Sequence, residues 1–171
     1  MFLPYVSWVE GFPIPMIISW VGLLFFWSII FLRKFEKVVK WAQFFALTFM
    51  GMLTTHAFVI GVGNFRILLT RPEKPMYQGL AMWVLSWSAP IQWISAILLF
   101  VGIYLLAARR VQGWWLALIA AASILAIDIP TQVIRTTMSD STSWDYLYGA
   151  LLCSGLLITL LIPKTRSALI G

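Results

Sequence analysis

The chain has 171 residues, of which 61% are hydrophobic and 11% charged, and its mean hydropathy is +0.92. This composition excludes a soluble globular domain and predicts a polytopic α-helical membrane protein. The net charge of +6 does not indicate a nucleic-acid-binding protein, because the basic residues flank apolar segments and are better explained by membrane topology. One cysteine, Cys153, allows neither an intrachain disulfide nor a cysteine-based metal site within the chain.

Five apolar segments are predicted to span a membrane, at residues 14–32, 41–62, 81–108, 113–134 and 146–162. The second helix is predicted to stop at Gly61, Gly63 and Asn64, which are typical of a helix end. A connection from Phe65 to Leu80 follows, and Pro163 with Lys164 closes the last segment. The predicted fold is an all-α integral membrane protein, a single transmembrane domain built as a bundle of five helices.

The orientation follows from the distribution of Lys and Arg. With five spans, eight basic residues between the spans and at the C-terminus fall on one side of the membrane and four on the other. The excess of basic residues marks the cytoplasmic side, which predicts an N-terminus outside and a C-terminus in the cytoplasm. The expected location is a plasma or cytoplasmic membrane.

An acidic residue, Asp128, lies inside the fourth apolar segment. Insertion scales give a central aspartate a cost of about 2.5–3.5 kcal/mol, so its carboxylate is expected to face the bundle interior and to be hydrogen-bonded. His56, the only histidine, and Asp128 each lie fifteen residues beyond the predicted membrane entry of their helices, at Trp41 and Gly113. At 1.5 Å per residue both lie about 22 Å along parallel helices, in the outer third of the membrane.

Other polar residues are predicted at this level. In the fourth segment, Gln132 and Arg135 share a helix face with Asp128, because the spacing is i, i+4, i+7. His56, Gln132 and Arg135 are the expected partners of the carboxylate. The predicted ligand-binding or proton-relay residues are His56, Asp128, Gln132, Arg135, Ser88 and Gln92.

The sequence leaves several roles open for this polar layer. In the first, Asp128 pairs with His56 or Arg135 and fixes helix packing. In the second, the layer forms a small-molecule or quinone pocket that opens to the outer leaflet. In the third, it is a proton relay with His and Asp as the carriers. No metal site is expected, and one histidine cannot supply a bis-histidine haem site. The motifs HExxH, GxSxG, GxGxxG and the P-loop are missing, so no catalytic residue, cofactor or enzyme class is assigned.

The hypothesis favoured by the sequence is a small subunit of a larger membrane-protein complex, with a structural or accessory role, for example in bioenergetics. The chain has no room for a separate catalytic domain and few buried polar groups for a self-contained transporter. The alternative is a stand-alone membrane enzyme or a small-molecule or quinone-binding protein using the pocket around His56 and Asp128. Expected partners are membrane lipids and other membrane subunits, without nucleic acid. Three basic residues of the 65–80 connection are docking candidates, namely Arg66, Arg71 and Lys74.

Overall fold

The computed structural model describes residues 17, 20–22, 41–70, 79–139 and 144–170. Over these residues the chain is helical apart from a few turn residues, without a strand, which confirms the all-α prediction. The longer helices are α2 (Trp41–Thr70), α3 (Leu80–Ala107), α4 (Val111–Ser139) and α5 (Trp144–Leu161), and a short helix, α6 (Pro163–Ile170), follows. Most of the predicted first span, residues 14–32, lies outside the described residues.

Three helical stretches are long and apolar enough to cross a membrane: Gln43–Arg66, Met82–Ala107 and Val111–Ile134. At 1.5 Å per residue each exceeds the roughly 30 Å of a bilayer core. They correspond to the second, third and fourth predicted spans. The stretch Tyr146–Leu161 is apolar but shorter. Over the described residues, the structure is therefore all-helical, with three helices long and apolar enough to span a membrane.

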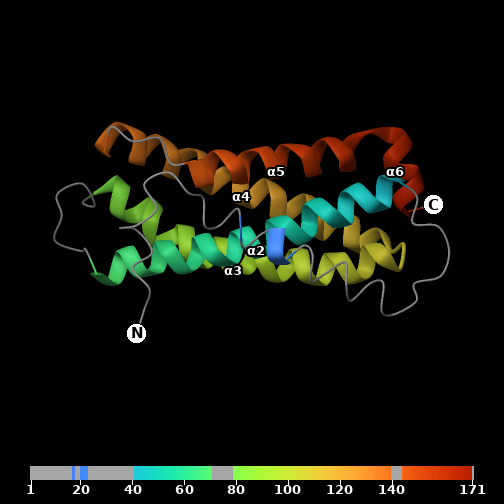
Figure 1. The fold of residues 1–171 in the computed structure, drawn as a ribbon, viewed down its shortest axis with the longest axis horizontal. Coiled ribbons are helices and arrows are strands. Elements are labelled where there is room, and N and C mark those ends of the chain that lie inside the picture. The colour runs from blue at the N-terminus through green and yellow to red at the C-terminus, as the bar shows by residue number, and fades with distance from the viewer. Residues whose placement is uncertain (1–16, 18–19, 23–40, 71–78, 140–143, 171) are drawn as a thin grey trace.

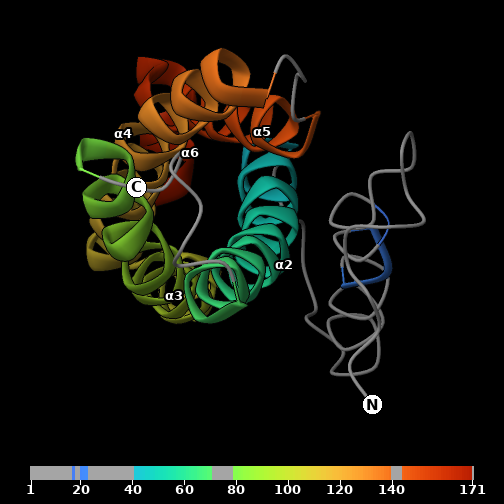
Figure 2. The ribbon, with the colours of Figure 1, turned by 90° about the vertical axis from the view of Figure 1, so that its left-hand side faces the viewer.

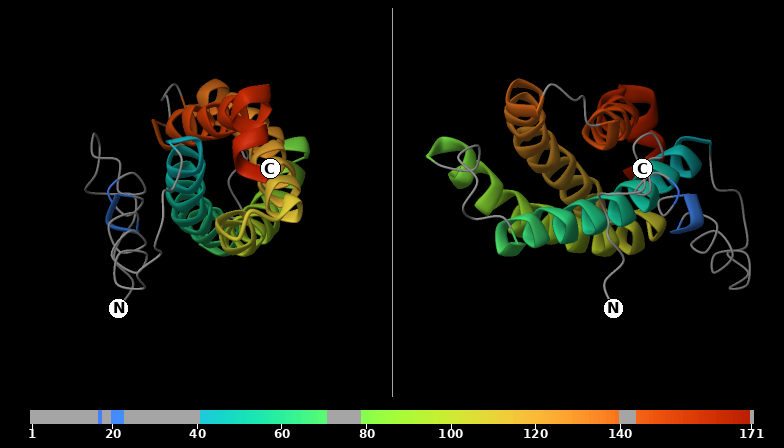
Figure 3. Two further views of the ribbon diagram at one scale, coloured as in Figure 1. Left: turned by 90° about the vertical axis from the view of Figure 1, so that its right-hand side faces the viewer. Right: turned by 60° about the vertical axis from the view of Figure 1, so that its left-hand side comes forward.

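The four long helices form an antiparallel ring in which each one packs on two others (Figures 1 and 2). Helix α5 closes the ring by contacting both α4 and α2, and α6 folds against one end of it. We call this end, where α2 and α4 begin and α3 ends, the α6 end. We call the opposite end the Asn64 end, after a buried residue of α2. The oblique view in Figure 3 shows the same helices running between the two ends.

The turn between α3 and α4 is fixed by backbone geometry. Arg109 adopts a φ of 56°, its N–H donates to Leu106 O, and the N–H of Arg110 donates to Leu105 O, each over 2.9 Å. These bonds satisfy carbonyls that a helix end otherwise leaves free. A Cβ on Gly113 would lie 2.4 Å from the backbone nitrogen of Leu106, so a glycine is needed where α4 passes the end of α3. The predicted stop of the third helix at Arg109-Arg110 agrees with the α3 end at Ala107.

The predicted end of the second helix is wrong, because α2 continues to Thr70. Gly61 does not stop the helix but makes room for the indole of Trp93, whose Nε1 would lie 2.5 Å from a Cβ at that position. Asn64 does not cap the helix either, since its side chain bonds to other helices. Arg66 therefore lies on α2 and not in a loop, whereas Arg71 and Lys74 lie outside the described residues.

Two further helix ends also differ from the prediction. Helix α4 continues from the predicted end near residue 134 to Ser139. Pro163 not only follows α5 but also begins α6, which the sequence analysis did not predict. Proline suits the first turn of a helix, because the N–H that it lacks has no partner there.

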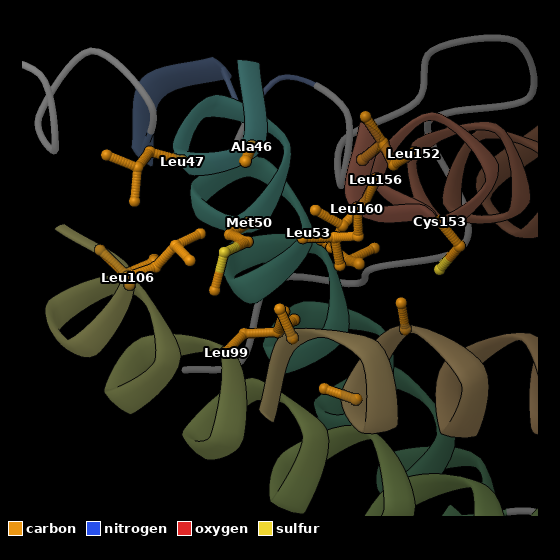
Figure 4. Packing of buried hydrophobic residues seen from close by; sticks show 14 of the residues in the cluster. Ala46, Leu47, Met50, Leu53, Leu99, Leu106, Leu152, Cys153, Leu156 and Leu160 are labelled. Atoms are coloured by element: carbon orange, nitrogen blue, oxygen red, sulfur yellow. The ribbon is translucent and has the colours of Figure 1, made fainter. Parts of the chain in front are cut away.

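A cluster of apolar side chains fills the half of the bundle nearest α6 (Figure 4). Its largest fully buried members come from all five helices: Met50, Leu53, Leu99, Leu106, Ile124, Leu156, Leu160 and Leu169. Polar side chains in this half bond to backbone carbonyls. Gln43 Nε2 donates to Leu106 O over 3.1 Å, and Trp114 Nε1 donates to Leu160 O over 3.0 Å. This half is thus a packed apolar core in which Gln43 and Trp114 are hydrogen-bonded, while the Thr48 hydroxyl has no hydrogen-bond partner among the described residues.

Candidate functional site

Asp128 lies in the interior of the bundle, with 1% of its surface exposed. Gln92 of α3, which is fully buried, donates a hydrogen bond from Nε2 to Asp128 Oδ1. The carboxyl group is therefore held by a neutral amide across the α3–α4 contact. The sequence analysis placed Gln92 in the same layer but expected the partner to be His56, Gln132 or Arg135.

His56 of α2 lies beside the same carboxyl group, with α5 passing close to both. A Cβ on Gly149 would lie 2.6 Å from His56 Nε2 and 3.0 Å from Asp128 Oδ2, so both atoms lie within 3.0 Å of one point. They do not hydrogen-bond to each other directly. The imidazole also meets the ring of Tyr148 edge-on, with 5.4 Å between ring centroids and 72° between planes. All four long helices thus contribute to the surroundings of Asp128 and His56.

Four polar atoms of this group have no hydrogen-bond partner within the described part of the chain: His56 Nδ1, His56 Nε2, Asp128 Oδ2 and Gln92 Oε1. Leaving one buried donor or acceptor unsatisfied costs about 1–3 kcal/mol, and such groups are rare in folded proteins. The three side chains gather these atoms at one place. We call His56, Gln92 and Asp128 the polar triad.

A second group of buried polar side chains lies farther along the bundle than the polar triad, toward the Asn64 end. Asn64 Nδ2 donates to Ser88 Oγ over 2.6 Å, and the Tyr146 hydroxyl donates to Asn64 Oδ1 over 2.7 Å. All three side chains are buried, and the bonds join α2, α3 and α5. Ser88 precedes Gln92 by one helical turn, and Asn64 follows His56 by eight residues, about 12 Å along the axis. This Asn64 network ties the helices together over the polar triad.

The other predicted site residues of α4 are not part of the polar triad. Gln132 is half-buried on α4, one turn beyond Asp128. Arg135 is part of α4, but its side chain lies outside the described residues. The structure thus brings His56, Gln92 and Asp128 together and places Ser88 in the Asn64 network.

Sequence reasoning missed the parts of the site that come from α5, which are Tyr146, Tyr148 and Gly149. They lie at the start of the last apolar segment, at the level at which the fourth segment ends. This position was the available signal that they lie near Asp128. It also missed Asn64, because Gly-x-Gly-Asn resembles a helix stop. An amide within an apolar helical stretch is a signal for a polar contact between helices.

The site offers no cluster for a metal ion: among the described residues, no group of three His, Cys, Asp or Glu side chains is arranged to hold one. Cys153 is buried and belongs to the apolar cluster. The arrangement instead offers hydrogen-bond donors and acceptors in a buried place.

No protein-family model, no curated protein and no solved structure matches this chain.

Proposed function

We propose that the chain is a membrane protein that binds a small hydrogen-bonding molecule in the polar half of its bundle. The observation that carries this proposal is the position of His56 Nε2 and Asp128 Oδ2. Both are buried, neither has a hydrogen-bond partner in the described structure, and both lie within 3.0 Å of one point. The two atoms are therefore close enough for one bridging hydrogen-bonding atom to span the distance between them.

The chemistry of the polar triad defines the class of ligand. An imidazole offers one donor and one acceptor, a carboxyl group accepts or donates according to its proton, and Gln92 Oε1 accepts. A hydroxyl group can accept from His56 and donate to Asp128, and a carbonyl oxygen can accept from either. Quinones and quinols carry these groups on an apolar ring, which suits a site inside a membrane bundle. They are the ligand class that we propose.

The topology extends this proposal. We infer five spans, with an outside N-terminus and a cytoplasmic C-terminus, from the eight-to-four distribution of basic residues. In this orientation the Asn64 end faces outward, and the ligand enters from the outer leaflet. With this orientation the apolar cluster would fill the cytoplasmic half, where the described helices carry few buried polar side chains. A binding site closed at its inner side agrees with these features better than a conducting path does.

Binding of decylubiquinone, a soluble short-chain quinone, tests the proposal. The protein is purified in mild detergent, and quenching of tryptophan fluorescence is followed during titration. We expect saturable binding, and about tenfold weaker binding for Asp128→Asn or His56→Gln, because a hydrogen bond to a buried polar group contributes about 1.5 kcal/mol.

Thr159→Val is the matched control, since the Thr159 hydroxyl bonds to Gly155 O within its own helix, far from the triad. Equal affinity of the wild type and of both triad variants would contradict a quinone site at the triad.

The role as a subunit of a larger complex stays a prediction. Large apolar side chains are exposed along α3, including Trp87, Ile97, Phe100 and Tyr104. Lipid tails and a partner helix would cover such a surface equally well. Native mass determination in mild detergent separates the two roles: a stable second protein supports the subunit, and a monomer or homodimer supports the stand-alone binding protein.

A further inference from the structure

The α6 end carries exposed positive charge. Arg109 and Arg110 in the α3–α4 turn and Arg166 on α6 are all exposed. The sequence has no acidic residue between Glu73 and Asp128, and none after Asp145. Neither segment therefore supplies a side-chain carboxylate next to these arginines. Such positive charge at the end of a membrane bundle favours an anionic group at the membrane surface.

Two of these arginines lie at the first turn of α4. The guanidinium of Arg166 lies 4.7 Å from the centroid of a Trp114 ring, and Trp114 is fixed by its hydrogen bond to Leu160 O. Arg110 directly precedes α4, and its carbonyl accepts a 3.0 Å hydrogen bond from the N–H of Gly113. Arg110 and Arg166 thus come from segments distant in sequence and lie at the same helix start.

A shallow apolar groove leads along α5 toward this place. It has a volume of about 540 Å³ and is lined by Ser154, Leu157, Ile158, Leu161, Ile162 and Pro163. The five residues from α5 and the α5–α6 bend are spaced so that they share one helix face. The groove ends at Pro163, the first residue of α6, and the N–H of Arg166 donates to Ile162 O over 2.9 Å. Arg166 therefore lies within one helical turn of the end of the groove at Pro163.

We propose that the α6 end binds one anionic phospholipid, with an acyl chain in the α5 groove and the phosphate at Arg166 and Arg110. A guanidinium group pairs with phosphate oxygens through two parallel N–H donors, which a compact ammonium group cannot reproduce. The apolar groove accounts for the tail and the arginines for the charge, so neither a free phosphate nor a neutral lipid matches both parts. The proposal does not depend on the polar triad.

Lipid retention measured by native mass spectrometry tests this site. The purified protein is mixed with phosphatidylglycerol or phosphatidylcholine of identical acyl chains. We expect the wild type to retain more phosphatidylglycerol than phosphatidylcholine. In the double variant Arg110→Gln/Arg166→Gln, the retention of phosphatidylglycerol should fall by a factor of about five for each arginine removed. Ile158→Trp, which fills the groove, is expected to lower the retention of both lipids. This second variant keeps the test valid if the arginine variant does not fold.

Ser86→Ala is the control, because Ser86 is an exposed residue near the start of α3, at the opposite end of the bundle. It is expected to retain phosphatidylglycerol like the wild type. Glycerol-3-phosphate, which has the anionic group without the tails, is expected not to displace the lipid. Equal retention of the two lipids, unchanged retention in the arginine variant, or displacement by glycerol-3-phosphate would each contradict the proposal.

Discussion

Both halves of the bundle contain fully buried side chains, but they differ in chemistry. Leu156 in the half nearest α6 and His56 in the half nearest Asn64 are both fully buried. In the first half, apolar side chains pack together, and Gln43 and Trp114 bond to backbone carbonyls. In the second half, polar side chains bond from helix to helix, and several buried polar atoms have no partner among the residues described. We infer that the first half stabilises the fold and the second half binds the ligand.

The largest effect on stability is expected in the apolar half. Leu156→Ala should lower the free energy of unfolding by about 2–5 kcal/mol, because it removes a buried side chain and leaves a cavity. Unfolding in mixed detergent micelles measures this loss. Ile158→Ala, on the same helix but 61% exposed, is the matched control and should change stability by less than about 0.5 kcal/mol. Similar losses for both variants would contradict the assignment of stability to this half.

A smaller loss is expected at the crossing of α3 and α4. Gly113→Ala places a Cβ against the backbone of Leu106 and should cost about 1–3 kcal/mol, since backbone atoms cannot rotate away. Gly155→Ala is the control, because its new Cβ meets the ring of Phe49, a side chain that can turn. Thermal unfolding compares the two variants. If Gly155→Ala proves the more damaging, the close crossing does not limit the packing of the bundle.

The Asn64 network should contribute less to stability than either position. Tyr146→Phe removes the hydrogen bond to Asn64 Oδ1, and hydrogen bonds between membrane helices contribute about 0.6 kcal/mol on average. Since this network lies over the polar triad, its loss should also speed the binding of decylubiquinone in stopped-flow measurements. Tyr104→Phe, at a residue 70% exposed, is expected to change neither quantity. An unchanged binding rate in Tyr146→Phe would show that the ligand reaches the triad by another route.

A comparably small effect on stability is expected at Asp128. Asp128→Asn keeps an oxygen that can accept the hydrogen bond from Gln92, so the free energy of unfolding should change by less than about 1 kcal/mol. The affinity for decylubiquinone should nevertheless fall, as proposed above. Chemical unfolding and ligand titration on one preparation compare the two effects. A loss of stability as large as that of Leu156→Ala would mean that Asp128 holds the helices together.

Much of the fold followed from the sequence, because helix length, apolar content and flanking charge are local properties. The stop at Arg109-Arg110 and the common level of His56 and Asp128 needed only the rise per residue and the order of the helices. Gly61 could not be interpreted locally, since a glycine inside a helix and a glycine at its end look alike without the neighbouring Trp93. Pro163 was likewise ambiguous, because proline follows helices and also begins them.

The partner of Asp128 shows why the site was harder to predict than the fold. Depth along a helix gives the level of a residue but not the rotation of one helix about its axis relative to another. Gln92 and His56 both lie near the level of Asp128, yet only Gln92 bonds to it directly. The approach of α5 depends on Gly149, whose missing side chain gives no signal in a hydropathy pattern.

A double-mutant cycle on ligand affinity tests most directly whether His56 and Asp128 act on one bound group. The dissociation constant of decylubiquinone is measured for the wild type, His56→Gln, Asp128→Asn and the double variant. If one ligand group is shared by both side chains, the double variant should bind about as weakly as either single variant, with a coupling of at least about 1 kcal/mol. Fully additive losses would mean that the two side chains contact the ligand independently, and no loss in any variant would remove the ligand from the polar triad.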